Sequence, residues 1–155
     1  MKAGKREYFL MNRYVFILVL MFFSSALGLE NSSSIKVHVK IEGFRSNNGH
    51  CYLLLFKDKK GFPESEKHAA IILKNSIIDK TATFIFDTSP GIYAISVLHD
   101  ENLNEELDKT WYGKPVEGFG ISNNPKINFG PPSFKKSLIS LKEKDNFIHI
   151  TMKYF

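Results

Sequence analysis

Apolar and polar residues alternate along most of this chain, and this period of two constrains the fold more than any other feature of the sequence. In residues 35–44 (IKVHVKIEGF), aliphatic residues are separated by Lys36, His38, Lys40 and Glu42. Successive side chains of a β-strand point to opposite faces, so the pattern predicts a strand with one buried face and one solvent-facing face. No segment shows the 3.6-residue period of a long helix.

Six further segments read as strands. They are residues 51–56, 69–73, 81–86, 92–98, 137–141 and 147–154. The SNNG turn at 46–49 holds residues that tolerate positive φ, which predicts a hairpin pairing 35–44 with 51–56. About seven strands at this spacing predict a single all-β domain, a β-sandwich.

The N-terminus has the layout of a signal peptide. A basic leader is followed by an apolar run, Tyr14–Leu27, that ends in small residues. We expect cleavage after Gly28, or two residues earlier, so that residues 1–28 are removed and residues 29–155 form the β-sandwich domain. A retained anchor is the alternative, but about 14 apolar residues fall short of the roughly 20 that span a bilayer. The sequence therefore predicts an exported protein, periplasmic or extracellular, with no membrane span after cleavage.

Charge and cysteine content exclude some classes of partner and crosslink. The leader holds four of the 21 basic residues and one of the 16 acidic ones, so the net charge falls from +5 to +2 when it is removed. The remaining charge is scattered, which disfavours nucleic acid as a partner. Cys51 is the only cysteine, so an internal disulfide is excluded, and we expect it to be a buried core residue.

Between the fifth and sixth predicted strands lies a long segment, Asp100–Lys135, with little strand pattern. It contains Trp111, Tyr112 and Phe119, and is too aromatic to be disordered, so we expect an ordered cap on the sandwich. One interpretation makes these aromatic residues a satellite core under the loop. The other makes some of them a recognition surface for a ligand or partner.

Asn123 and Asn124 in SNNP (residues 122–125) carry strong turn chemistry. Asn side chains bond nearby backbone and tolerate left-handed conformations, so the first interpretation is that the pair staples the cap loop. The second is that the two amides bind a sugar or peptide, with Trp111 and Tyr112 as stacking surfaces.

The chain is similar to the bacterial family catalogued as domain of unknown function 2141. Three motifs, in this order, carry the resemblance: HDEN followed by Asn104 and Leu107-Asp108, then YGKPVEGFGISNN, then FGPPSF. The likeness covers residues of about 35–155, nearly the whole mature chain. It implies an exported sandwich of the transthyretin-like or immunoglobulin-like kind. No activity is established for the family, so the resemblance implies a fold and leaves the function open.

The stretch HDENLNEELD is a candidate calcium loop, since the family pattern there resembles the first nine positions of such a loop. The ligands would be the side chains of four residues and the carbonyl of a fifth: Asp100, Asn102, Asn104 and Asp108, with the carbonyl of Glu106. Calcium prefers six to eight such oxygens.

Three departures weaken this interpretation. Glu105 stands where the sharp turn normally needs glycine, Leu103 replaces the other family glycine, and Trp111 stands where a helix-flanked loop has its bidentate Glu. Glu105 must therefore adopt an unfavourable backbone conformation, at a cost of about 1–2 kcal/mol. A weak calcium site and a metal-free turn held by Asx hydrogen bonds both stay open. Glu101, Glu105 or Glu117 could complete a distorted site.

Enzymatic motifs are scarce in the sequence. The five histidines show no metal spacing, and there is no G-x-S-x-G motif. We expect a non-enzymatic binding or interaction module of the cell envelope, with no catalytic residues, whose partner is an envelope protein or a glycan. The alternative is an envelope or extracellular hydrolase that uses the loop carboxylates and His99.

Overall fold

The computed structural model describes residues 34–105, 108–111, 113, 116–126, 130 and 132–154. The predicted signal peptide, residues 1–28, lies outside the described residues, as do Glu106 and Tyr112. In the described part of the chain, no helix is both long and apolar enough to cross a membrane.

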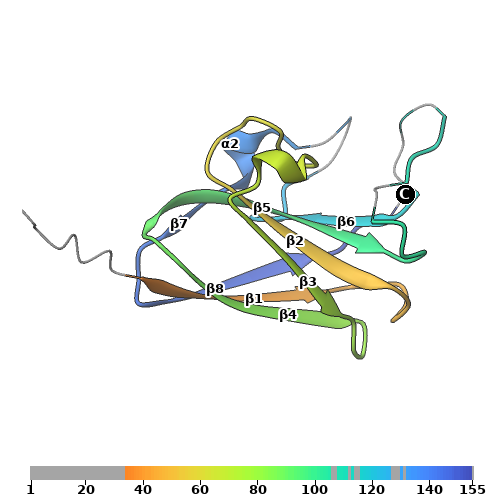
Figure 1. Ribbon diagram of the computed structural model, residues 1–155, viewed down its shortest axis with the longest axis horizontal. Coiled ribbons are helices and arrows are strands. Elements are labelled where there is room, and N and C mark those ends of the chain that lie inside the picture. The colour runs from red at the N-terminus through yellow and green to blue at the C-terminus, as the bar shows by residue number, and fades with distance from the viewer. Residues whose placement is uncertain are drawn as a thin grey trace, which may run out of the picture. The chain divides into compact units, whose positions relative to one another are not determined.

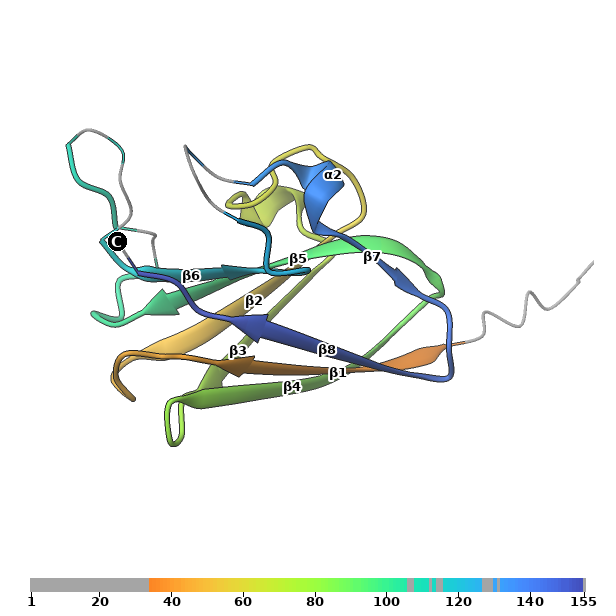
Figure 2. The same cartoon turned by 180° about the vertical axis from the view of Figure 1, so that it is seen from behind.

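Two β-sheets face each other, as Figure 1 and its reverse view in Figure 2 show. The three-stranded sheet has the order β4 (Thr81–Thr88), β1 (Ile35–Glu42), β8 (Asp145–Thr151), with β1 antiparallel to β4 and parallel to β8. The five-stranded sheet has the order β3 (Ile71–Ser76), β2 (His50–Phe56), β5 (Gly91–Asp100), β6 (Gly118–Ile121), and β7 (Leu138–Leu141) also pairs with β5. Two short helical turns, η1 (Glu66–His68) and α2 (Phe134–Ser137), complete the described elements. The predicted all-β sandwich is confirmed.

Each of the seven predicted segments contains a strand, but the predicted hairpin was wrong. The SNNG turn does not close a hairpin, because β1 pairs with β4 and β8 whereas β2 pairs with β3 and β5 in the other sheet. The connection therefore crosses between the sheets, and its Gly49 adopts φ 72. The segment Asp100–Lys135, in which little strand pattern was expected, contains one short strand, β6, and its first residue ends β5.

The core lies between the sheets and follows the period of two. In β1 the residues Val37, Val39 and Ile41 are fully buried, while the residues between them face solvent to varying degrees. Burying a Val, Leu or Ile side chain contributes about 1.5–3 kcal/mol, which makes this alternation the main determinant of which face points inward. Cys51 of β2 is fully buried, as expected, and burial raises the pKa of its thiol.

A second, smaller cluster covers the outer face of the five-stranded sheet. Tyr52, Leu54 and Phe56 of β2 lie under residues that include Phe62 and Phe134. The rings of Phe62 and Phe134 pack edge to face with centroids 5.4 Å apart. Both faces of β2 are therefore buried, as its continuous apolar run predicts.

Candidate functional site

The candidate calcium loop starts at the end of β5, where Asp100 is fully buried. Its two carboxylate oxygens accept the backbone N–H groups of Asn104 (3.2 Å) and Glu105 (3.1 Å). The Asn104 N–H is also donated to the side-chain oxygen of Asn102 at 3.0 Å, an Asx turn. The buried carboxylate thus folds the loop back over the strand end.

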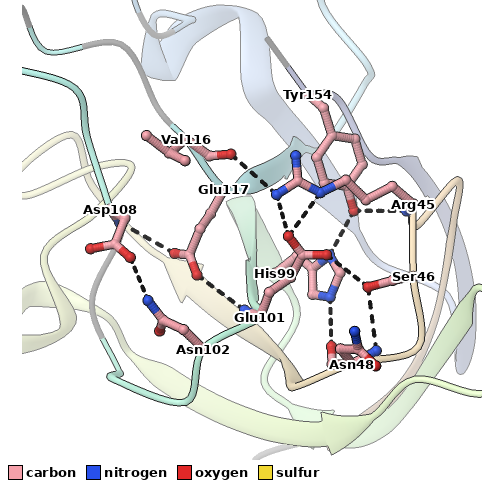
Figure 3. Close-up of polar contacts among 10 residues, drawn as sticks. All are labelled: Arg45, Ser46, Asn48, His99, Glu101, Asn102, Asp108, Val116, Glu117 and Tyr154. Atoms are coloured by element: carbon pink, nitrogen blue, oxygen red, sulfur yellow. Dashed lines mark hydrogen bonds and ion pairs between the residues drawn. The ribbon is translucent and has the colours of Figure 1, made fainter.

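Asp108 closes the loop from its other end. The side-chain amide of Asn102 donates to one Asp108 oxygen at 2.6 Å, and the amide of Asn104 donates to the other at 3.1 Å (Figure 3 draws the first contact). Of the five candidate ligands, the structure brings four together: Asp100, Asn102, Asn104 and Asp108. The fifth, Glu106, lies outside the described residues.

Two loop residues carry positive φ without being glycine. Leu103 has φ 65 and Glu105 has φ 63, and these are the two positions where the family pattern has glycine. The predicted unfavourable conformation of Glu105 is confirmed. An L-residue in this region is strained by roughly 1–2 kcal/mol, so the loop keeps its shape against a local backbone preference.

Glu117 lies beside the loop carboxylates at the start of the segment that leads into β6. It is 3% exposed, and its side chain accepts the N–H groups of Glu101 (3.0 Å) and Asp108 (3.2 Å), as Figure 3 shows. Burial raises the pKa of Glu117, the two backbone hydrogen bonds lower it, and the charges of Asp108 and Asp100 raise it further. The main cause of the raised pKa of Glu117 is therefore its burial, with a smaller contribution from the charges of the two loop aspartates.

The other two glutamates suggested for a distorted site point elsewhere. Glu101 accepts hydrogen bonds from the Arg45 guanidinium, whose Nε lies 2.8 Å away, and from the Ser46 hydroxyl at 2.7 Å. The Arg45 hydrogen bond is the main reason that the pKa of Glu101 lies below its ordinary value.

Glu105 belongs to the opposite side of the loop. It accepts a hydrogen bond from the Lys74 ammonium, which lowers its pKa, and a second from the Tyr52 hydroxyl, each at 3.1 Å. Of the three suggested glutamates, only Glu117 faces Asp100 and Asp108.

His99 points to the opposite face of β5 and is fully buried. Its Nε2 lies 2.8 Å from the carbonyl oxygen of Asn48, which can only accept, so Nε2 carries the hydrogen. Its Nδ1 lies 2.7 Å from the Tyr154 hydroxyl, which also accepts the Arg45 backbone N–H at 3.1 Å. Nδ1 then accepts the Tyr154 hydrogen, and both ring nitrogens are used within the fold (Figure 3).

The aromatic candidates have different environments. Trp111 is 96% exposed, whereas Phe119 is half-buried in β6 opposite Leu98. Tyr112 lies outside the described residues. The satellite-core interpretation therefore does not describe Trp111, whereas Phe134, near the end of the same segment, does belong to such a cluster.

Asn123 and Asn124 both adopt left-handed conformations, with φ of 65 and 45. The Asn123 amide donates to the carbonyl of Leu138 at 2.6 Å. The Asn124 side chain donates to the carbonyl of His149 (3.0 Å) and accepts the N–H of Thr151 (2.8 Å), as a neighbouring strand would. The two side chains therefore join the segment after β6 to β7 and β8 through hydrogen bonds, as the first interpretation of this pair expects.

Several important partners were not identified from the sequence. Arg45, Tyr52 and Tyr154 organise the site, yet none stands in a recognisable motif. Among the side chains that the structure describes, no group of three or more His, Cys, Asp or Glu residues is arranged to hold a metal ion.

Comparison with known proteins gives one match. The model of the family described as "uncharacterized protein conserved in bacteria (DUF2141)" matches residues 39–149, which include the whole loop from Asp100 to Glu117. No curated protein and no solved structure shows significant similarity.

Proposed function

The chain belongs to the DUF2141 family of uncharacterised bacterial proteins, and from that premise we propose that it is an exported, non-enzymatic binding module of the cell envelope. The observation that carries the proposal is the 96% exposure of Trp111 on a loop whose base is fixed by hydrogen bonds. A large aromatic side chain held out on an ordered support is typical of residues that dominate binding interfaces. An envelope protein or a glycan is the class of partner that the sequence suggests.

The surroundings of His99 favour binding over hydrolysis. A general base must come within hydrogen-bonding distance of a substrate proton. His99 is fully buried with both nitrogens bonded, and Asp100 is fully buried with both carboxylate oxygens bonded. A hydrolase using these groups would have to break several of these hydrogen bonds before any substrate could reach them.

The binding proposal is tested by pelleting with an envelope fraction. The processed chain is incubated with sedimented envelope, and the bound fraction is compared between the wild type, Trp111→Ala and Phe147→Ala. Phe147 is a matched control, because it is 77% exposed and lies on the other sheet. We expect Trp111→Ala to weaken binding about tenfold, the effect of leaving one large apolar side chain unburied, and Phe147→Ala to bind like the wild type. Equal binding by all three proteins would refute the proposal.

We also propose that the loop from Asp100 to Asp108 binds calcium weakly. Four ligand-type side chains converge there, and the buried carboxylate of Glu117 lies beside them, where a cation would offset the cost of burying its charge. The amides of Asn102 and Asn104 direct nitrogen atoms at Asp108, so both would have to rotate to present oxygen. The strained turn and this rotation both reduce the expected affinity.

Calcium binding is tested by calorimetry on protein stripped with a chelator, while the melting temperature and the Trp111 fluorescence are followed. We expect a saturable heat in the millimolar range and a higher melting temperature, both lost in Asp100→Asn. The control is Asp87→Asn, which changes an exposed carboxylate on the three-stranded sheet. If up to several millimolar calcium gives no response, the loop is a metal-free turn.

A further inference from the structure

The outer face of the three-stranded sheet is uncovered in the part of the chain that the structure describes. In Figures 1 and 2 the helical turns η1 and α2 both lie on the five-stranded sheet, and no described segment lies over the outer face of β4, β1 and β8. The side chains of this outer face alternate with the core positions of the three strands. What the face can contact is therefore set by these outward side chains.

Three outward side chains form one row across the middle of the sheet. Ile85 of β4 and Phe147 of β8 are both direct neighbours of His38 of β1 in the strand register. Ile85 is 60% exposed and Phe147 is 77% exposed, and the rings of His38 and Phe147 stack with centroids 4.7 Å apart. Single exposed apolar residues are normal on a surface, whereas adjoining ones that span a whole sheet are typical of contact surfaces. We call these three residues the middle row.

The rows on either side of the middle row differ in charge. One has two carboxylates and one ammonium group, and the other has one ammonium group, one imidazole and no carboxylate. In the order β4, β1, β8, the acidic row is Asp87, Lys36 and Asp145, and the basic row is Thr83, Lys40 and His149. Glu42, one position further along β1, pairs with both Lys40 and His149, so the charge difference between the two rows is modest. The face is therefore complementary to itself when it is turned end for end.

We infer that this face is the contact surface of a weak dimer of the chain, in which the middle rows of two copies stack about a two-fold axis that runs along them. A two-fold axis makes both copies use the same surface. This axis lays the acidic row of each copy over the basic row of the other. An axis parallel to the strands would instead lay acidic row on acidic row, and like charges in contact disfavour an interface.

The ion pairs within each chain are compatible with this arrangement. Lys36 faces Lys40 of the other copy, but Lys36 is paired with Asp87 of its own chain and Lys40 with Glu42 of its own chain. The positive and negative charges of the face nearly balance, so it offers little attraction to an anionic bilayer or a nucleic acid. A surface with an apolar centre and balanced charge favours a second copy over these charged partners.

The size of the face predicts that the dimer is weak. Strands rise about 3.3 Å per residue and lie about 4.8 Å apart, so three strands of 7 or 8 residues present a face of roughly 25 Å by 14 Å. Such a face buries roughly 400–600 Å² per copy, below the roughly 800 Å² of a standard interface. We therefore expect a dissociation constant of roughly 10–100 μM. At the low concentrations of the envelope pelleting assay the chain is then a monomer, so Phe147→Ala keeps its role as a control there.

The test is sedimentation velocity of the processed chain over a concentration series, with two matched variants. Ile85→Lys places a charge in the middle row. Ile92→Lys is the control, because Ile92 is 59% exposed and lies on the outer face of the other sheet. We expect Ile85→Lys to raise the dissociation constant at least about tenfold, the effect of leaving one Ile unburied, and Ile92→Lys to associate like the wild type. Circular dichroism checks that each variant is folded.

Variants of Thr83 test the direction of the two-fold axis. In the inferred dimer, Thr83 lies over Asp87 of the other copy, so Thr83→Lys should lower the dissociation constant severalfold and Thr83→Glu should raise it severalfold. Within one chain, Thr83 is the register neighbour of Lys40, so Thr83→Glu should raise the melting temperature of the monomer. The opposite signs separate a contact between copies from an effect on the fold.

The outcomes separate this inference from the proposed function. A wild type that stays monomeric at concentrations tenfold above the expected dissociation constant overturns it, as does equal weakening by Ile85→Lys and Ile92→Lys. A dimer that Thr83→Glu strengthens overturns the two-fold axis along the middle row. If the wild type is a monomer and Ile85→Lys reduces envelope pelleting, the face binds an envelope partner instead of a second copy. The result for Trp111→Ala in the pelleting assay decides the proposed function independently.

Discussion

Replacing Leu103 by glycine should stabilise the domain, although it removes an aliphatic side chain. Leu103 has φ 65 and is 57% exposed, so little apolar burial is lost. Removing the Cβ atom relieves the strain of the left-handed backbone and should raise the free energy of unfolding by about 1–2 kcal/mol. The extra conformational freedom of glycine in the unfolded chain should lower it by about 0.5–1 kcal/mol. Relative to Leu103→Ala, which keeps the Cβ atom, Leu103→Gly should therefore raise the free energy of unfolding by about 0.5–1 kcal/mol.

The assay is urea unfolding of the wild type and both variants in the presence of chelator, so that calcium does not contribute. A gain of this size corresponds to a melting temperature about 2–4 °C higher in a domain of this length. Lys59→Gly is the control, because Lys59 is an exposed loop residue outside the positive-φ region. If Leu103→Gly is less stable than Leu103→Ala, by an amount similar to the loss in Lys59→Gly, the argument from backbone strain is refuted.

Three further predictions concern groups that the fold buries or pairs. The Arg45 guanidinium holds the pKa of Glu101 below its ordinary value. This ion pair therefore stabilises the fold fully above a pH of about 4.3, the ordinary pKa of a glutamate. The stabilisation is lost as the pH falls through the lower pKa that Glu101 has in the folded protein. Urea titrations from neutral to acidic pH should therefore show a smaller decline for Arg45→Gln than for the wild type. A thiol reagent should label Cys51 only as fast as the chain unfolds, since the thiol is fully buried with a raised pKa, and labelling rates with and without urea check this. Asn124→Gly keeps the left-handed backbone but removes two hydrogen bonds to β8, so the free energy of unfolding should fall by about 1–2 kcal/mol in urea melts.

The period of two, together with the continuous apolar run of β2, was sufficient to locate seven strands. β6 was not predicted, because glycines, Gly118 and Gly120, occupy its inward-facing positions and the alternation of apolar and polar side chains is absent there. A Cβ atom on Gly118 would lie 2.3 Å from the Tyr154 ring, and one on Gly120 would lie 2.7 Å from the Ile150 side chain. These glycines leave room for the packing of the C-terminal segment, and that requirement comes from residues 36 and 30 positions away along the chain.

In the candidate site, too, features set by nearby residues could be predicted, whereas contacts made by residues distant in the sequence could not. The positive φ at Glu105 could be predicted, because the family pattern that the loop resembles has glycine at that position. The surroundings of His99 could not be predicted, because its two partners come from different parts of the chain. Cys51 pairs with His99 in the β2–β5 register, which brings the carbonyl of Asn48 close, and the Tyr154 hydroxyl comes from the chain end.

The two neighbouring residues at the end of β5 have different structural roles, and each supports a different part of the fold. His99 faces inward and links the β1–β2 connection to the C-terminal segment through Asn48 and Tyr154. Asp100 faces outward, and its carboxylate folds the loop. Both side chains are fully buried, so a substrate would have to displace part of the fold to reach either one. Trp111, in contrast, is 96% exposed, on a loop whose base is held by hydrogen bonds. This difference in exposure is the physical reason for our proposal that the protein binds its partner through the loop that carries Trp111.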